Sequence, residues 1–306
     1  MKYKNQINNN TSIKKIYQKI FYGLIKRNYY YLSSPFRVLP ECFVIGVVRS
    51  GTTSLYHYLG QHPCIGPSAY DEIGYFDENY HLGINWYKSL FPTKFTRDKI
   101  IKKHGKFLTY DVTPQYLREP YVAKRMFQTF PKMKLIVLLR NPIDKSYSHH
   151  IMGKNSNTLN NNPEWEGIDN KQVSFEDIVN RDIEFISKYE KKNGELNDNY
   201  FRNVITKTNL ARGFYAQFLR KWFDVYDRKQ FLILSSSELA NSTQKTLNKI
   251  FNFLEIPEYD IPDTTKINTQ KYEPMKKQTR EILIQFFKKY NNELYELIDR
   301  KFDWDK

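Results

Sequence analysis

Residues 42–55, CFVIGVVRSGTTSL, decide the fold of this chain. The apolar run from Cys42 to Ile45 favours a β-strand, and Gly51 closes the loop that follows. Thr52 and Thr53 then open a helix. In such a strand–loop–helix unit, backbone N–H groups and the positive end of the helix can hold a phosphate group. The stretch therefore predicts an anion-binding loop at the end of a buried strand.

The spacing of this loop is that of a nucleotide-binding P-loop with one substitution. Thr52 stands where a nucleoside triphosphatase has the Lys that reaches the β- and γ-phosphates, and Arg49 supplies a cation nearby. This combination favours a nucleotide with a single 5′-phosphate over ATP hydrolysis. The predicted phosphate contacts are Arg49, Ser50, Gly51, Thr52, Thr53 and Ser54.

Strands and helices alternate along the rest of the chain. Further strands are predicted at 107–110, 134–139 and 231–234, and helices at 52–59, 121–130, from about 144, 210–226, 243–254 and 276–302. This order predicts a P-loop-like, three-layer α/β/α fold with a central, mostly parallel sheet. We expect a single domain over residues 41–306, with a polar surface insertion at about 153–172 and a basic extension at 1–40.

Charge is distributed unevenly in this chain of 306 residues with a net charge of +15. Residues 1–40 contain eight Lys or Arg and no acid. This extension is either a solvated tail or, over 13–32, an amphipathic helix that makes peripheral contact with a membrane surface. It is too short and too charged to span a bilayer, and it lacks a signal-peptide cleavage site.

Two cysteines form no disulfide framework, so we expect a reducing, cytoplasmic setting, and no Cys/His spacing suggests a metal site.

Taken together, the motifs resemble the sulfotransferases that use 3′-phosphoadenylyl sulfate, most closely the heparan sulfate N-/O-sulfotransferase-like branch. The matching blocks are Arg49 to Leu55, Leu59 to Pro63, Glu72 to Phe76, Tyr80 to Tyr87, Arg140-Asn141-Pro142 with Ser148, and Gly213 to Ala216. Two positions depart from that branch: Arg49 replaces a Lys, and Val112 replaces the Lys of its E-K-[S/T]-P-x-Y block.

The resemblance implies an in-line sulfuryl transfer without a metal ion, which leaves adenosine 3′,5′-bisphosphate. In this reading Glu72 is the general base, with a pKa raised by partial burial, and Asp71 is its alternative. Arg49 stabilises charge on the departing 5′-phosphate. Arg140 and Ser148 bind the 3′-phosphate, and Tyr215 and Lys271 assist nucleotide binding.

The acceptor implied by the resemblance is a hydroxyl or amine, most readily that of a saccharide. Candidate acceptor contacts are His81 and Trp86, for which packing in an aromatic core is the alternative role. One of His149 and His150 is a further candidate, since at most one of these neighbours on a helix can face the cleft. Two other functions remain open: a nucleotide kinase or NTPase with a degenerate P-loop, and a non-enzymatic polyanion-binding protein. We expect no nucleic-acid partner, because the ordered phosphate motifs favour a small nucleotide.

Overall fold

The computed structural model describes residues 31–155, 173–193, 201–267 and 273–304. Residues 1–30 of the basic extension, 156–172 of the expected insertion and Lys271 lie outside these ranges.

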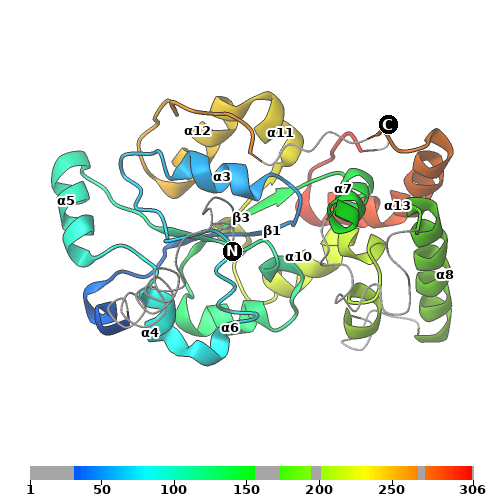
Figure 1. Cartoon of the computed structure of the whole chain (residues 1–306), viewed down its shortest axis with the longest axis horizontal. Helices are drawn as coiled ribbons and strands as arrows, with labels where there is room; N and C mark the ends of the chain where they lie inside the picture. Colours follow the sequence, from blue (N-terminus) through cyan, green and yellow to red (C-terminus); the bar gives the residue numbers. More distant parts are fainter. Residues whose placement is uncertain (1–30, 156–172, 194–200, 268–272, 305–306) are drawn as a thin grey trace, which may run out of the picture.

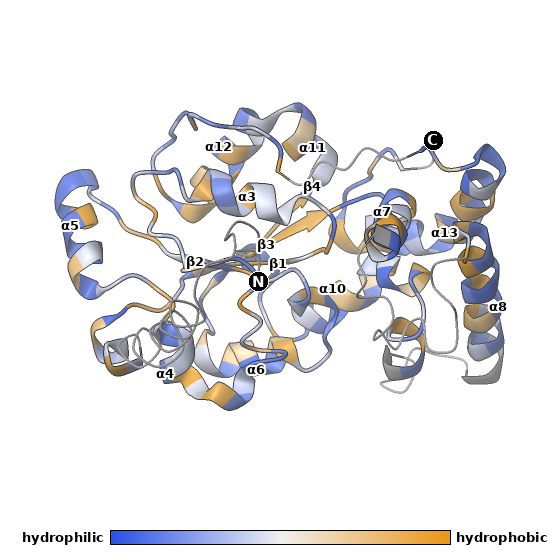
Figure 2. Cartoon of the chain, in the orientation of Figure 1, coloured by the Kyte–Doolittle hydropathy of each residue, from blue (hydrophilic) through white to orange (hydrophobic). Residues whose placement is uncertain are grey.

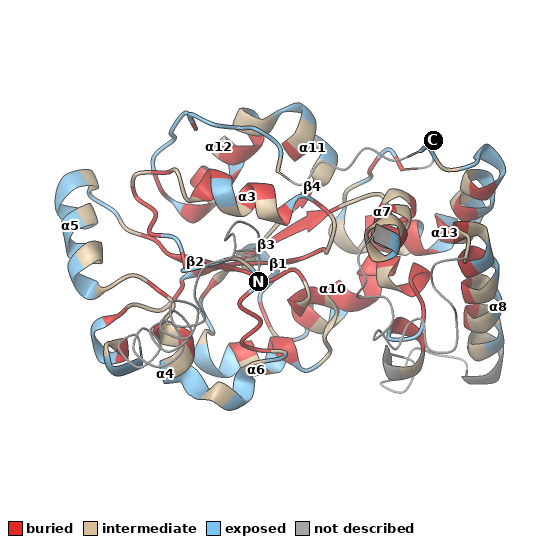
Figure 3. Ribbon diagram, viewed as in Figure 1, coloured by how far each residue is buried: buried red, intermediate tan, exposed pale blue. Residues whose placement is uncertain are grey.

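A four-stranded parallel sheet forms the centre of the molecule, with strand order β2-β1-β3-β4. The strands are β1 (Cys42–Gly46), β2 (Tyr110–Val112), β3 (Lys134–Leu139) and β4 (Phe231–Ser235). The side chains of β1, β2 and β3 are mostly apolar and almost entirely buried, as a parallel sheet covered on both faces requires, while the first three residues of β4 are half-buried (Figures 2 and 3). The predicted fold class is confirmed.

The prediction for the second strand was wrong in its position, because β2 begins at Tyr110 rather than at residue 107. Leu108 pairs instead with the segment that follows the first helix: its N–H donates to the Cys64 carbonyl, and its own carbonyl accepts from the Gly66 N–H. Pairing with β1 starts only where Tyr110 lies opposite Cys42. An apolar run shows that a segment is buried and extended, but it does not show which neighbour pairs with it.

Alternate residues of β1 serve two separate cores. Cys42 and Val44 face the core under α3 (Thr52–Leu59), α11 (Ser236–Asn241) and α12 (Thr243–Leu254), which cover one face of the sheet (Figure 1). Phe43 and Ile45 face the larger core on the opposite side. The described helices that contribute to that side are α4 (Gly83–Lys88), α6 (Val122–Thr129), α7 (Pro142–Asn155), α8 (Phe175–Asn193), α10 (Tyr215–Phe223) and α13 (Lys277–Ile298). Helix α5 (Lys94–His104) lies at the end of the molecule opposite α8 (Figure 1).

The helix expected over 210–226 is divided into the short helix η8 (Leu210–Gly213) and α10. Gly213 explains the close packing at this point, since a Cβ there would lie 2.7 Å from the Pro142 side chain and 2.8 Å from the ring of Phe287. Helix α7 also differs from expectation, because it begins at Pro142 and continues to residue 155, into the predicted insertion. In the described parts of the chain, no helix is both long and apolar enough to cross a membrane.

Candidate active site

A large cavity opens at the carboxyl ends of the four parallel strands, where ligands bind in open α/β sheets. Its volume is about 2070 Å³. The loop after β1, the segments after β2 and β3, and the start of α11 after β4 all contribute to its walls. Of the residues predicted to bind the nucleotide or catalyse, it brings together Arg49, Ser50, Gly51, Thr52, Thr53, Ser54, Glu72, Arg140 and Ser148.

The loop after β1 has the geometry of an anion-binding turn. Gly51 adopts a left-handed conformation (φ 98°) directly before the first turn of α3, which glycine tolerates without steric cost. Ser50 Oγ donates to the Val47 carbonyl at 2.6 Å and thereby holds the loop closed on itself. The first amides of α3 have no carbonyl partner within the helix, so they are suited to bind a phosphate.

Arg49 and Arg140 connect this loop to α7. Arg49 Nε donates to Ser148 Oγ at 3.1 Å, although the two residues are 99 positions apart. Arg140 Nη1 donates to the Arg49 carbonyl at 2.7 Å and braces the loop. Tyr215 is buried and does not line the cavity, but its hydroxyl donates to the Arg140 carbonyl at 2.9 Å. Tyr215 therefore supports Arg140 from behind, which differs from the direct contact with the nucleotide that we expected.

Glu72 and Asp71 lie on the wall of the cavity, in the segment that crosses the end of β2. Glu72 has a left-handed backbone (φ 55°), and its N–H donates to the Val112 carbonyl at 2.7 Å. Glu72 is exposed, so the prediction that it is partly buried was wrong for the chain without a bound acceptor. The left-handed turn directs the residue to the cavity surface, whereas Ile73 next to it is in the core.

A buried carboxylate supports the segment that carries Glu72. Asp111 accepts hydrogen bonds from the Tyr87 hydroxyl at 2.7 Å and from Thr113 Oγ1 at 2.8 Å. Thr113 Oγ1 also accepts from the Gly74 N–H at 3.3 Å, two residues beyond Glu72. Burial raises the pKa of Asp111 to about 6, while the hydrogen bonds from Tyr87 and Thr113 oppose this rise.

We expect Asp111 to make folding pH-dependent. Between about pH 4 and 6 the unfolded carboxyl loses its proton while the folded one keeps it, so the free energy of unfolding falls as pH rises. The raised pKa corresponds to a loss of about 3 kcal/mol by neutral pH. Asp111→Asn should remove this dependence, measured as denaturant unfolding of both proteins from pH 4 to 7. Asp98→Asn, at an exposed position, is the control. If the free energy of unfolding changed with pH by the same amount in wild type and Asp111→Asn, the prediction would be contradicted.

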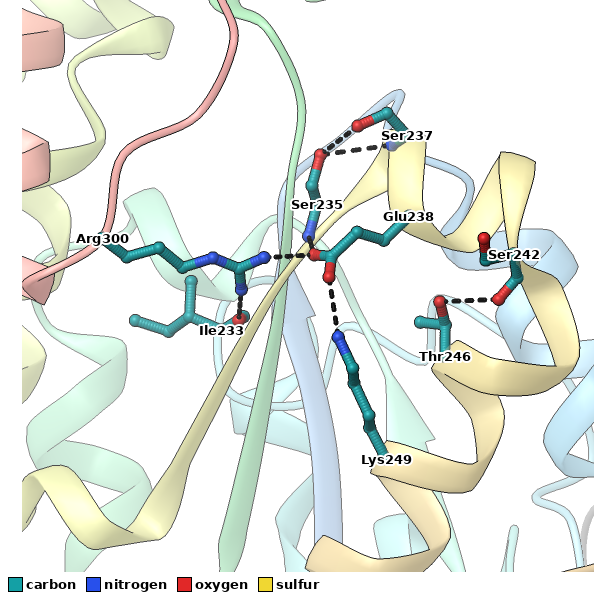
Figure 4. A network of polar contacts seen from close by, with 8 residues as sticks. All are labelled: Ile233, Ser235, Ser237, Glu238, Ser242, Thr246, Lys249 and Arg300. Carbon is teal, nitrogen blue, oxygen red and sulfur yellow. Dashed lines mark hydrogen bonds and ion pairs between the residues drawn. The ribbon is translucent and has the colours of Figure 1, made fainter.

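A polar network fixes the end of β4, where Ser235 and Ser237 line the cavity (Figure 4). The Ser235 N–H donates to Glu238 Oε2 at 2.9 Å, and Arg300 Nη2 donates to the same oxygen at 2.6 Å. Lys249 Nζ donates to Glu238 Oε1 at 2.9 Å. Burial raises the pKa of Glu238, but these three donors outweigh it and lower the pKa to about 2. A charged carboxylate thus holds this wall of the site in place.

Several cavity residues were missed by the sequence reasoning, among them Arg118, Lys145, Arg212 and Lys266. Lys145 had a usable signal, because it lies on the same predicted helix as Ser148, three residues before it. Arg118 and Arg212 lie in the short helices η4 (Tyr116–Arg118) and η8, and Lys266 lies in a loop; the sequence does not reveal the direction of these three side chains. No group of three or more His, Cys, Asp or Glu in the described ranges could hold a metal ion.

The candidate acceptor residues occupy different places. His149 lines the cavity, whereas His150 is buried against Phe175. His81 is exposed in the short helix η3 (Tyr80–Leu82) and does not line this cavity. Trp86 also lies outside its walls, stacked on Tyr75 with ring centroids 6.4 Å apart. Trp86 is partly buried and packs against the aromatic core, which is the alternative role named for it from the sequence.

Comparison with solved structures shows the same fold. A sulfotransferase from Alicyclobacillus acidocaldarius matches with a TM-score of 0.61 and 23% identity, over 88% of this chain and all of that one. Among curated proteins, the membrane-associated sulfotransferase kil1 of Dictyostelium discoideum is 27% identical over 87% of this chain. The bifunctional heparan sulfate N-deacetylase/N-sulfotransferase 4 of mouse is 25% identical over 86% of it.

This chain spans 66% of the Dictyostelium relative and 30% of the mouse relative. These relatives do not support the expectation of a cytoplasmic setting, since the Dictyostelium protein is described as membrane-associated. Residues 39–300 match the model of the sulfotransferase domain. This range contains all the residues that line the cavity except Asp303 and Trp304. The chain therefore belongs to the sulfotransferase domain family, as the motif resemblance predicted.

Proposed function

We propose that this protein transfers the sulfuryl group of 3′-phosphoadenylyl sulfate to a hydroxyl or amine of a saccharide. The observation that carries the proposal is the junction of Arg49, Ser148 and Arg140. These residues come from two distant sequence motifs and meet at 3.1 Å and 2.7 Å on the wall of one cavity. The loop with Arg49 is suited to bind a 5′-phosphate, and Arg140 with Ser148 is suited to bind a 3′-phosphate. 3′-Phosphoadenylyl sulfate carries a phosphate at both positions.

Each donor contact has a defined task in this proposal. Backbone amides at 50–53, with the hydroxyls of Thr52 and Thr53, hold the 5′-phosphate at the start of α3. The Arg49 guanidinium offers several N–H donors to the oxygen that becomes negative as the 5′-phosphate leaves. Arg140 and Ser148 bind the 3′-phosphate, and Tyr215 orients Arg140 through its carbonyl. Lys271, which lies outside the described residues, keeps its predicted role of assisting nucleotide binding through its charge.

Glu72 removes the proton of the attacking acceptor. Its carboxylate lies on the wall of the cavity that also contains Arg49, and its backbone is held by Val112 and indirectly by Asp111. An acceptor seated in the cavity would cover Glu72 and bring the proton of its hydroxyl or amine within reach of the carboxylate. Asp71 is the alternative base on the same segment.

A saccharide is the acceptor that the relatives and the cavity support. The mouse relative is described as a heparan sulfate N-sulfotransferase, and a cavity of about 2070 Å³ exceeds the size of ordinary small-molecule pockets. His149 is the predicted acceptor contact that lines this cavity.

We further propose that the site belongs to a single domain over 41–306 and that the basic residues 1–40 make peripheral contact with a membrane.

Calorimetric titration with adenosine 3′,5′-bisphosphate tests the donor assignment, with AMP and ATP·Mg²⁺ as controls. Tight binding of the bisphosphate, with much weaker binding of AMP, is the expected result. Preference for ATP·Mg²⁺ would favour a nucleotide kinase or NTPase, although Thr52 in the Lys position argues against it. Binding of none of the three would favour a non-enzymatic polyanion-binding protein.

A further inference from the structure

Two segments that are separate in sequence meet at the end of the molecule opposite α8. Helix η2 (Ser34–Phe36) lies at the same end as α5 (Figure 1, dark blue). Arg37, directly after η2, pairs in antiparallel register with Thr93, directly before α5. The Val38 N–H also donates to the Pro92 carbonyl at 3.0 Å. These contacts place the end of η2 beside the start of α5.

This end carries the three most exposed large apolar side chains among the described residues. Leu32 is 74% exposed, Phe36 is 69% exposed and Phe95 is 79% exposed. Single exposed apolar residues are common on folded proteins, but a group of them at one place marks an interaction surface. The group therefore indicates a partner that can take apolar side chains out of water.

Helix α5 is 11 residues long, and none of its residues is buried. Most helices in folded proteins gain their stability by packing an apolar face against the core. The charged residues of α5 are five cations and one acid, namely Lys94, Arg97, Lys99, Lys102, Lys103 and Asp98. Asp98 pairs with Arg97 at 2.8 Å, whereas none of the four lysines forms an ion pair with another described residue. All four lysines are exposed, so α5 presents a basic surface to its surroundings.

The aromatic and basic groups of α5 share one face. Phe95, Lys99 and Lys102 follow helical spacing, and all three are exposed. Such a face is suited to the interface of a lipid bilayer, where an aromatic ring enters the boundary of the acyl chains and lysines contact anionic headgroups. A polyanionic saccharide would pair with the lysines but would leave Phe95 in water.

The sequence that leads into this end has the same sign of charge. Residues 1–30 contain seven Lys or Arg and no acid. Like charges repel, so this stretch is not the electrostatic complement of α5. An anionic membrane surface attracts both, since each Lys or Arg close to such a surface contributes to binding. Charge thus favours a membrane over residues 1–30 as the partner of this surface.

We propose that η2 and α5 form a docking surface for an anionic lipid membrane. Leu32, Phe36 and Phe95 enter the headgroup region, and the lysines of α5 contact lipid phosphates and carboxylates. This inference rests on the proposed peripheral contact of residues 1–40 with a membrane, and it adds a folded surface to that contact. No residue of η2 or α5 lines the cavity, so the docking surface is separate from the donor site.

Sedimentation of the full chain with lipid vesicles tests the proposal. The chain should bind vesicles of phosphatidylcholine with about one quarter phosphatidylserine, and bind phosphatidylcholine alone much more weakly. Phe95→Ser should weaken binding to the anionic vesicles about tenfold, as expected when one aromatic side chain no longer leaves water. Lys99→Gln combined with Lys102→Gln should also weaken it about tenfold or more.

Matched control variants lie on α13, at the other end of the molecule (Figure 1). Ile282→Ser removes an exposed apolar side chain there, and Lys277→Gln combined with Lys288→Gln removes two exposed charges. Both controls should keep the wild-type affinity for vesicles. Circular dichroism of every variant checks that it is folded.

A fluorescent label reports the position of the contact. Both native cysteines are buried, so an environment-sensitive dye can be attached to Phe95→Cys. Its emission should shift to shorter wavelength with anionic vesicles, whereas the same dye on Ile282→Cys should show no shift. An unshifted dye at position 95 would place the contact elsewhere and overturn the proposal.

The other outcomes separate this surface from its rivals. Loss of binding in the lysine variant with wild-type binding in Phe95→Ser would indicate a surface for polyanions in general and would overturn lipid docking. Loss only in a variant with Lys14→Gln, Lys15→Gln and Lys19→Gln would leave the peripheral contact of residues 1–40 in place and remove η2 and α5 from it. Binding to neither kind of vesicle would overturn both, while the donor assignment is tested separately by nucleotide titration.

Discussion

Glu72→Gln is expected to lower the turnover number about 10²- to 10⁴-fold, the usual contribution of a positioned general base. The amide keeps the shape of the side chain and cannot accept the proton of the attacking group. The affinity for adenosine 3′,5′-bisphosphate should remain nearly unchanged, because the donor contacts come from other segments of the cavity wall. Transfer from labelled donor to an acceptor oligosaccharide, with calorimetry of the bisphosphate beside it, measures both quantities.

Asp71→Asn is the matched control, since Asp71 is next to Glu72 and lines the same cavity. Its effect on turnover should be small. Full activity of Glu72→Gln would remove Glu72 from the role of base without affecting the fold or the donor site. If Asp71→Asn caused the loss instead, the base would be Asp71.

Arg140→Ala should weaken binding of adenosine 3′,5′-bisphosphate about 10- to 100-fold, as expected for loss of a charge-assisted contact with a phosphate. The affinity for AMP, which lacks the 3′-phosphate, should fall much less. The comparison is needed because Arg140 also braces the phosphate loop through the Arg49 carbonyl at 2.7 Å. Calorimetric titration of both nucleotides into wild type and variant gives the ratio directly.

An equal loss for both nucleotides would show that Arg140 acts by bracing the loop and would contradict its assignment to the 3′-phosphate. The conservative Arg140→Lys separates the roles further. A lysine keeps the charge but loses the forked geometry of the guanidinium. Retained preference for the bisphosphate in this variant would support a direct charge contact.

Much of the geometry of the proposed donor site could be predicted because its parts are local in sequence. The strand, loop and first helix lie within residues 42–59, and their hydrophobic pattern, glycine and helix start act over a few residues. The parallel sheet followed from the alternation of strands and helices. Arg140 and Ser148 could be paired for the same reason, since they lie within about two helical turns of each other at the end of β3.

Predictions failed where a contact depended on distant segments. The start of β2 depends on the Cys64–Gly66 segment pairing with Leu108, and the break between η8 and α10 lies where Gly213 packs against Pro142 and Phe287. The exposure of Glu72 depends on a left-handed turn that no composition rule predicts for glutamate.

The sequence by itself determined the layer order of the fold and the strand–loop–helix unit over residues 42–59, because short-range patterning encodes these features. Only the tertiary structure decided which basic side chains share the cavity with this unit. Arg118, Lys145 and Arg212 lie in separate segments, and their meeting depends on how α7 and η8 pack beside the sheet. Electrostatic interaction depends on distance in space, so the positive face of this cavity exists only in the folded chain.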